Sequence, residues 1–117
     1  MDDEIGEQLA ATGTVALLET RGRVSGRSAR AAVGYVEEPD GSLIVAAGRP
    51  DAAWALNLMA DPACTTTIGE AVTTRLAEEL TGAERNAAVA SLILRYGTPA
   101  EGLGRGPAFR LRRILTD

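Results

Sequence analysis

The sequence predicts one α+β domain, mainly antiparallel β, in which about six strands form a closed or split β-barrel with two or three flanking helices. Three observations support this fold class. The 117 residues suffice for one modest hydrophobic core. Several segments have the length and alternation of strands, and most are joined by short turns typical of hairpins. A barrel is the simplest way for so small a sheet to hide its edge strands.

The chain is expected to begin with a short helix over residues 1–12. Ile5 and Leu9 lie one helical turn apart, and the acidic residues before them favour the positive end of a helix. The run TVALLETR, residues 14–21, is apolar and β-branched and has the length of a strand. A tight basic turn is expected to follow over residues 22–27.

The next two strands are separated by a Pro-Asp-Gly turn at residues 39–41. Residues 28–38 alternate, which places four side chains on one face: Ala29, Ala31, Val33 and Tyr35. The run SLIVAA, residues 42–47, forms the following strand. The short connections predict that these strands lie side by side in an antiparallel meander.

A helix over residues 50–60 is inserted into the barrel, which spans residues 14–80. Pro50 suits its first turn, and the Asp-Pro pair that follows residue 60 ends it. The remaining elements are strands over residues 63–69 and 71–80, a helix over 81–97 and a closing strand over 107–115. Thr81 and Glu84 have the spacing of a capping box at the start of the third helix. All of these elements belong to a single domain, residues 1–117.

The composition excludes several classes of function. The sequence contains no histidine, which removes Ser-His-Asp and Cys-His nucleophiles and nearly every catalytic zinc site, so no metal is expected. The single cysteine, Cys64, lies in an apolar strand and is expected to be buried and inert. A net charge of −4 argues against nucleic-acid binding. There is no transmembrane run and no signal-peptide pattern, so a cytoplasmic protein is expected.

The basic turn GRVSGR is the first candidate site. Gly22 and Gly26 are expected to take positive φ, so that neighbouring N–H groups form a concavity for an anion. Ser25 adds a hydroxyl, and Arg23 and Arg27 add forked donors suited to phosphate. The alternative is an ordinary solvated hairpin end, and these residues alone leave both interpretations open.

Three segments in order resemble the deazaflavin (F-420)-dependent nitroreductase family, within the FMN/deazaflavin-binding split β-barrel superfamily. They are VALLETRGRVSGRSARAAVGYV, GSLIVAA and AAWALNLMADP. The resemblance runs from about residue 14 to residue 68, with a looser similarity up to Tyr96. It implies a split β-barrel, a homodimer, and a deazaflavin coenzyme in a groove with its phosphate and acidic tail on the basic turn.

The resemblance also assigns site residues. Gly22, Arg23, Ser25 and Gly26 match the phosphate-side turn, with Arg27 beside them. Ala46, Ala47 and Gly48 match the loop that passes the coenzyme ring, and their N–H groups are expected to polarise it. Trp54 and Asn57 match the Trp-x-x-Asn-Leu helix. The alternative is a structural role for each residue: Trp54 as an anchor in the core or in a dimer interface, and Asn57 as a hydrogen-bond partner of buried backbone groups.

This sequence departs from the family pattern at several positions. Val24 stands where the family has lysine, and Ala29 stands where it has arginine. Arg30 is one place later, on the opposite face of a strand, and replaces that arginine only if a bulge re-aims it. The ring-side loop is shorter, and Arg49 partly replaces its missing lysine.

The resemblance implies hydride transfer from the coenzyme to a quinone, a nitro-aromatic or another conjugated acceptor. Tyr35 is the candidate proton donor, whereas Tyr96 lies on an apolar helix stripe and is interpreted as structural. Two alternatives remain: an FMN-binding flavoprotein of the same fold, and a non-catalytic ligand-binding or dimeric interaction module with a degenerate site. The arginines of FRLRRI, residues 109–114, are explained by a solvated strand face.

Overall fold

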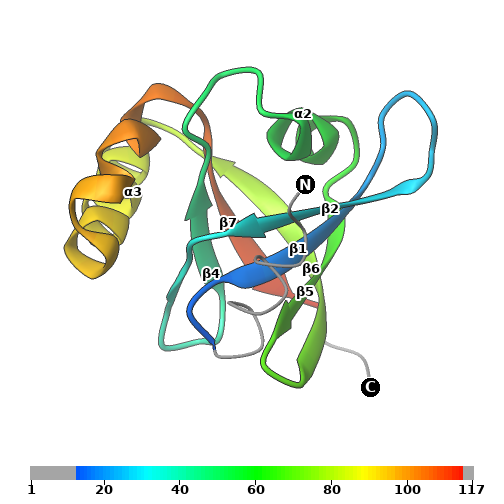
Figure 1. The fold of residues 1–117 in the computed structure, drawn as a ribbon, viewed down its shortest axis with the longest axis horizontal. Coiled ribbons are helices and arrows are strands. Elements are labelled where there is room, and N and C mark those ends of the chain that lie inside the picture. The colour runs from blue at the N-terminus through cyan, green and yellow to red at the C-terminus, as the bar shows by residue number, and fades with distance from the viewer. Residues whose placement is uncertain (1–12, 115–117) are drawn as a thin grey trace.

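The computed structural model of the protein describes residues 13–114 and contains a strongly curled antiparallel sheet with helices packed against it (Figure 1). The strands are β1 (Ala16–Arg21), β2 (Ser28–Val33), β3 (Val36–Glu37), β4 (Leu43–Ala46), β5 (Ala63–Ile68), β6 (Ala71–Leu80) and β7 (Ala108–Arg113). The helices are α2 (Ala53–Ala60), α3 (Gly82–Tyr96) and the 3-10 helix η1 (Thr98–Arg105). The helix expected over residues 1–12 lies outside the described residues.

The strand order of the sheet is β2-β1-β5-β6-β7-β4-β3, with every neighbouring pair antiparallel. This confirms the expected α+β split-barrel class, with seven strands rather than about six. The predicted meander is only partly right: β1 pairs with β2 and β3 pairs with β4, but the two hairpins lie at opposite edges of the sheet. β2 and β4 do not pair: β2 is one edge of the sheet, and β4 lies between β7 and β3 near the other edge.

The predicted strand over residues 28–38 breaks at Gly34 and Tyr35, and α3 explains why. The N–H of Tyr35 donates to the hydroxyl of Tyr96 at 3.0 Å, so the helix takes a bond that a neighbouring strand would otherwise receive. A Cβ at Gly34 would lie 3.0 Å from the ring of Tyr96. The chain therefore leaves β2 at its contact with Tyr96 of α3 and continues as β3 at the opposite edge of the sheet.

Two apolar clusters fill the fold, and β4 contributes to both. All four residues of β4 are buried. Leu43 and Val45 face the interior of the curled sheet, whereas Ile44 and Ala46 face α3. Burial on both faces explains why this strand reads as a continuous apolar run. α2 packs on the other side, over β1 and β2 (Figure 1).

α2 starts later than predicted, whereas α3 has the predicted N-cap residue but not the predicted capping bonds. α2 begins at Ala53, because the carbonyl of Ala52 accepts its first helical bonds, and Pro50 lies in the turn before it. Thr81 is the N-cap of α3, but its side chain makes no capping bond. The Glu84 carboxylate instead accepts from Arg110 at 3.3 Å, so the predicted capping box does not form.

The arginines of the last strand are not all solvated, which corrects the prediction for FRLRRI. Arg110 is only 17% exposed and makes a bidentate pair with Glu38 at 2.7 and 3.2 Å. These bonds raise the pKa of Arg110 above its ordinary value. Arg112, at 53% exposure, is solvated as expected and pairs with Glu78. None of the helices in residues 13–114 has the length and apolar character needed to span a membrane.

Candidate functional site

The basic turn between β1 and β2 is closed by its own backbone. The N–H of Gly22 donates to the carbonyl of Arg27 at 2.8 Å, and the N–H of Gly26 donates to the carbonyl of Gly22 at 2.8 Å. The N–H of Arg27 donates to the Ser25 hydroxyl at 3.1 Å. Within the described residues, only the N–H groups of Val24 and Ser25 in this turn lack an acceptor.

This geometry corrects the expectation for one of the two glycines. Gly26 has a φ of 74°, as predicted, but Gly22 does not take positive φ. A Cβ at Gly22 would lie 3.0 Å from both the Arg27 carbonyl and the Ser25 hydroxyl. Gly22 is therefore needed for close approach, and most N–H groups of the expected concavity are already engaged.

Asn57 of α2 holds the turn in place. Its Oδ1 accepts from the backbone N–H of Arg23 at 3.2 Å and from the Arg23 guanidinium at 2.9 Å. Its Nδ2 donates to the Thr20 hydroxyl at 3.0 Å. Asn57 and Thr20 are each only 3% exposed, so this polar junction lies within the fold. The guanidinium of Arg23 also reaches the carbonyl of Ala53 at 3.5 Å, at the start of α2.

A groove of about 410 Å³ lies between β2 and α2 and meets the turn at Asn57. Its lining is Thr20, Ala29, Arg30, Ala31, Gly48, Arg49, Ala52, Ala53, Trp54 and Asn57. Trp54 is partly buried, and its ring centroid lies 5.9 Å from that of Phe109 beneath it. The groove is therefore mostly apolar, with its polar groups at the two ends.

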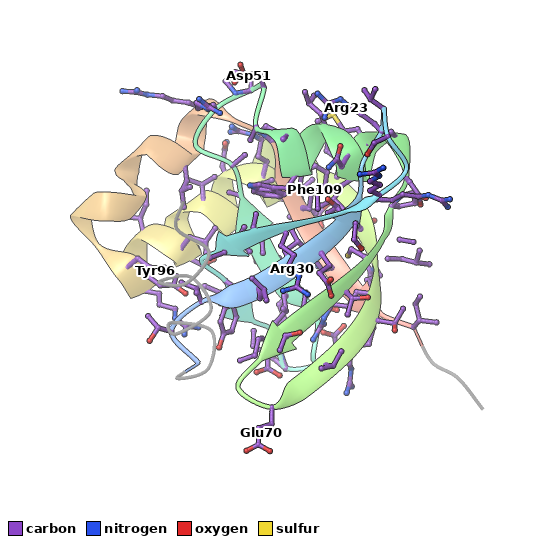
Figure 2. All side chains as sticks on the ribbon, turned by 45° about the vertical axis from the view of Figure 1, so that its right-hand side comes forward. Arg23, Arg30, Asp51, Glu70, Tyr96 and Phe109 are labelled. Carbon is purple, nitrogen blue, oxygen red and sulfur yellow. The ribbon has the colours of Figure 1, made fainter. Side chains whose placement is uncertain are left out.

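The groove and the turn together collect most of the predicted cofactor-binding residues. Gly48, Arg49, Trp54 and Asn57 line the groove, and Arg30 borders it from β2 with its side chain paired to Glu19. Gly22, Arg23, Ser25 and Gly26 border an adjoining hollow of about 360 Å³. The guanidinium groups of Arg21 and Arg27 make no hydrogen bond or ion pair with the part of the chain that the structure describes. Arg21 borders the same hollow as Arg23, and Arg27 lies in the same turn; Figure 2 shows Arg23 beside α2.

Arg30 is not re-aimed toward the groove. β1 and β2 pair without a bulge from Ala16↔Val33 to Arg21↔Ser28, so Arg30 keeps the face opposite that of Ala29 and Ala31. Its Nε donates to Glu19 at 3.3 Å on that outer face. At the other end of the groove, Arg49 pairs with Asp51 at 3.6 Å in an exposed loop.

Three predicted residues lie away from the groove lining. Ala46 and Ala47 are buried, and the N–H of Ala47 donates to the Pro107 carbonyl at 2.9 Å, so it cannot also polarise a bound ring. Tyr35 is 7% exposed, and its hydroxyl donates to the Gly13 carbonyl at 2.8 Å. Its ring lies against the guanidinium of Arg95, 4.3 Å away. This setting gives Tyr35 a structural role, and its use as a proton donor stays a prediction.

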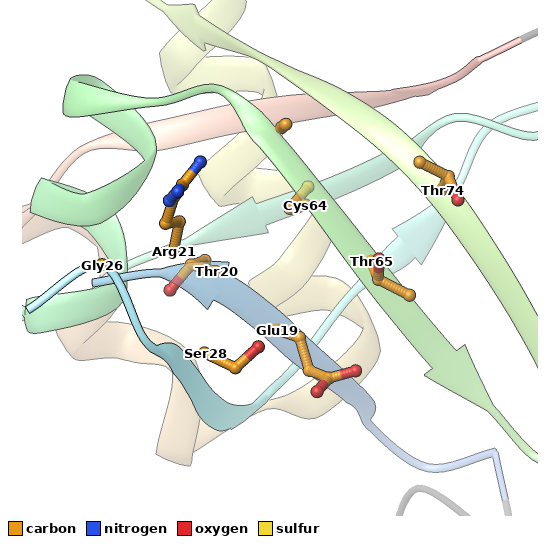
Figure 3. A pocket seen from close by; sticks show the side chains of 9 residues that line it. Glu19, Thr20, Arg21, Gly26, Ser28, Cys64, Thr65 and Thr74 are labelled. Atoms are coloured by element: carbon orange, nitrogen blue, oxygen red, sulfur yellow. The ribbon is translucent and has the colours of Figure 1, made fainter. Parts of the chain in front are cut away.

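A second hollow, of about 340 Å³, lies beside β1 and β5 (Figure 3). Glu19, Arg21, Ser28 and Thr65 border it, together with Cys64. Cys64 is 5% exposed, and burial raises the pKa of its thiol to about 11. The thiol is therefore inert at neutral pH, as the sequence predicted. Within the described residues, no group of three or more cysteine, aspartate or glutamate side chains is arranged to hold a metal.

Thr20 is a site residue that the sequence reasoning missed. The only signal in the sequence is the alternation of the strand. Ala16 and Leu18 face inward, and Thr20 continues the same face as a polar residue. Its partner is 37 residues away along the chain, and nothing local identifies it.

The model of the F420H(2)-dependent quinone reductase family matches residues 1–98. Among solved structures, an F420-H2 dependent reductase (FDR-A) is 26% identical, with a TM-score of 0.71 over 85% of this chain and 94% of that one. A domain-swapped dimer is also 26% identical, with a TM-score of 0.72 over 94% and 96% of the two chains. A heme storage protein from Vibrio cholerae, 19% identical, shares the fold, with a TM-score of 0.71 over 98% of this chain and 91% of that one. No curated protein matches the sequence.

Proposed function

The chain belongs to the F420H(2)-dependent quinone reductase family, and from this premise we propose that it binds a reduced deazaflavin coenzyme and reduces a quinone or another conjugated acceptor. When bound, that coenzyme supplies the hydride. The proposal places the coenzyme ring in the groove between β2 and α2 and its anionic part at the turn over residues 22–27.

One observation carries this proposal. The groove and the turn are joined by a buried polar junction, in which Asn57 lines the groove and binds Arg23 of the turn. An apolar hollow that ends in a fixed guanidinium is complementary to a flat ring system that carries an anionic chain. The two residues that meet here lie 34 positions apart in the chain, and each matches a different element of the family pattern.

The donor set fits an anionic group. Arg23 is oriented by Asn57, and its guanidinium keeps further N–H groups for a ligand. Arg21 and Arg27 add two exposed cations without partners among the described residues. The free N–H groups of Val24 and Ser25 lie in the same turn. Three guanidinium groups around one short turn favour phosphate or carboxylate over a neutral ligand.

The groove residues supply position and exclusion of water rather than acid–base chemistry. Ala29, Ala31 and Ala53 give a flat, apolar lining, and Trp54 closes one side of it. Among the side chains that face the groove, the charged group is the guanidinium of Arg49, which offers hydrogen-bond donors rather than a general acid or base. We therefore propose that the proton that completes the reduction comes from water, or from Tyr35 if that residue is released from its bond to Gly13.

We also propose that the protein is a homodimer. The outer face of the sheet carries exposed apolar side chains on β6, with Val72 68% and Leu76 46% exposed. A second copy would cover them, and analytical ultracentrifugation tests this directly. A monomer at concentrations well above those of the binding assays would contradict the proposal.

Titration of the purified protein with the oxidised and reduced deazaflavin, followed by coenzyme fluorescence, tests the proposed function. Saturable binding in the micromolar range, together with coenzyme-dependent reduction of a quinone, supports it. A yellow protein that retains FMN through purification would favour the flavoprotein alternative. Binding of neither coenzyme would contradict both enzyme functions and favour a non-catalytic module.

A further inference from the structure

The wall of the groove opposite β2 is formed by the segment that follows β4. Gly48 and Arg49 of this segment line the groove. They lie beyond the last ladder pair of β4 with β7, Ala46↔Ala108. One further backbone bond, from the N–H of Ala47 to the Pro107 carbonyl, continues the pairing at 2.9 Å. The position of this wall therefore depends on what packs behind it.

Gly106 is the residue directly behind the wall. A Cβ at this position would lie 2.5 Å from the carbonyl oxygen of Ala47 and 2.6 Å from that of Arg49. Both obstacles are backbone atoms, so no side-chain rotation could relieve the contact. The φ of Gly106 is −121°, which any residue adopts. Glycine is therefore required here for close approach and not for its conformational freedom.

Arg85 of α3 fixes the segment that contains Gly106. Its Nη2 donates to the carbonyl of Gly104 at 2.7 Å and to the carbonyl of Gly106 at 2.6 Å. One guanidinium nitrogen thus ties the end of η1 to α3 at two points. Leu103 of η1 packs into the apolar cluster under the same helix. The wall, Gly106, Arg85 and α3 form a continuous series of contacts.

We propose that Gly106 and Arg85 are positioning residues for coenzyme binding, and that they set the width of the groove by fixing its Gly48–Arg49 wall from behind. The expected effect on coenzyme binding rests on the proposed function, whereas the expected effect on the width of the groove does not depend on a bound coenzyme. Neither residue lines the groove, so both act only through the wall.

The test compares Gly106→Ala with Gly104→Ala, which makes the same chemical change two residues away. A Cβ at Gly104 meets only the Val89 side chain at 4.0 Å, an ordinary contact. Gly106→Ala is expected to weaken deazaflavin binding at least about tenfold, because displacement of a binding wall by roughly 1 Å is costly. Gly104→Ala is expected to bind like the unchanged protein.

Trp54 provides a readout that needs no coenzyme. It is the only tryptophan of the chain and lines the same groove. Displacement of the wall should make its fluorescence more accessible to acrylamide in Gly106→Ala but not in Gly104→Ala. If the unchanged protein binds no deazaflavin, the proposed function fails, and the quenching comparison still decides the structural inference.

Variants of Arg85 keep the proposal testable if Gly106→Ala does not fold. Arg85→Ala removes both bonds to η1 and should increase Trp54 quenching and weaken coenzyme binding, whereas Arg85→Lys, which retains a cationic donor, should restore part of both. If Gly106→Ala folds and shows unchanged coenzyme affinity and unchanged Trp54 quenching, the proposal is overturned. If Gly106→Ala does not fold, the same two results in Arg85→Ala overturn it. Equal effects in Gly104→Ala and Gly106→Ala would overturn it too.

Discussion

The guanidinium of Arg23 donates to Oδ1 of Asn57 at 2.9 Å, and the backbone N–H of Arg23 donates to the same oxygen at 3.2 Å. A single buried amide of α2 thus fixes both the main chain and the side chain of the basic turn. The two Arg23 donors fix the orientation of that amide, because they require an acceptor: Oδ1 therefore faces Arg23, and Nδ2 donates to the Thr20 hydroxyl.

The first prediction concerns this junction. Asn57→Ala removes the acceptor of two donors and the donor to Thr20, and each buried polar group left without a partner costs about 1–3 kcal/mol. We expect the free energy of unfolding, measured by urea denaturation, to fall by about 2 kcal/mol or more. The control is Asn86→Ala on the exposed face of α3, which should change it little. Equal losses in the two variants would contradict the assigned role.

The second prediction concerns Arg23. Arg23→Ala should weaken deazaflavin binding at least about tenfold, because a hydrogen bond to a charged group is worth about 1.5–3 kcal/mol. Arg112→Ala, which removes the same charge from the exposed end of β7, is the matched control and should leave affinity unchanged. Wild-type affinity in Arg23→Ala would show that the turn is not part of the site.

The third prediction is a gain of affinity at Val24. This side chain is 93% exposed in the same turn as Arg23 and Arg27, so a longer side chain meets no steric obstacle. Val24→Lys should tighten deazaflavin binding by about fivefold, the equivalent of roughly 1 kcal/mol for an exposed ion pair. Val24→Gln, which is neutral, should not. The gain should shrink as salt is added, and a gain that is independent of salt would argue against an electrostatic cause.

The fourth prediction separates the two arginines of β7. Arg110→Ala leaves the half-buried Glu38 carboxylate without its bidentate partner and should cost about 1–3 kcal/mol of unfolding free energy. Arg112→Ala breaks an exposed pair and should cost less than about 1 kcal/mol. Urea denaturation at constant ionic strength measures both values. A cost for Arg112→Ala as large as that for Arg110→Ala would contradict the distinction.

The sequence predicted the strands and helices well because their signals are local. Alternation over residues 28–33 and the apolar stripe of α3 each lie within one segment. The strand order was not predictable in this way. The break between β2 and β3 depends on Tyr96, whose hydroxyl receives the N–H of Tyr35 from 61 residues away. Local turn chemistry alone favoured a meander.

The same limit applies to the site. The family pattern identified Arg23 and Asn57 as neighbours of one ligand, and the structure brings them into direct contact. It did not identify Thr20 or Gly106, since the importance of each lies in an atom from a distant segment. A Cβ placed at Gly106 would lie 2.5 Å from the carbonyl oxygen of Ala47. Nothing in the sequence marks this requirement, because Gly106 lies in no tight turn and has an ordinary φ.

The last prediction follows from the pKa of Cys64, which burial raises from its ordinary value of 9.0 to about 11. Between these values the unfolded chain loses the thiol proton while the folded chain keeps it, so the folded state binds more protons and stability must fall as pH rises. The full shift corresponds to about 2–3 kcal/mol at roughly 1.4 kcal/mol per pH unit. Because Cys64→Ala removes this group, the free energy of unfolding of the variant, measured by urea denaturation from pH 8 to 11, should decline less steeply than that of the unchanged protein. Parallel curves would show that the thiol titrates alike in both states.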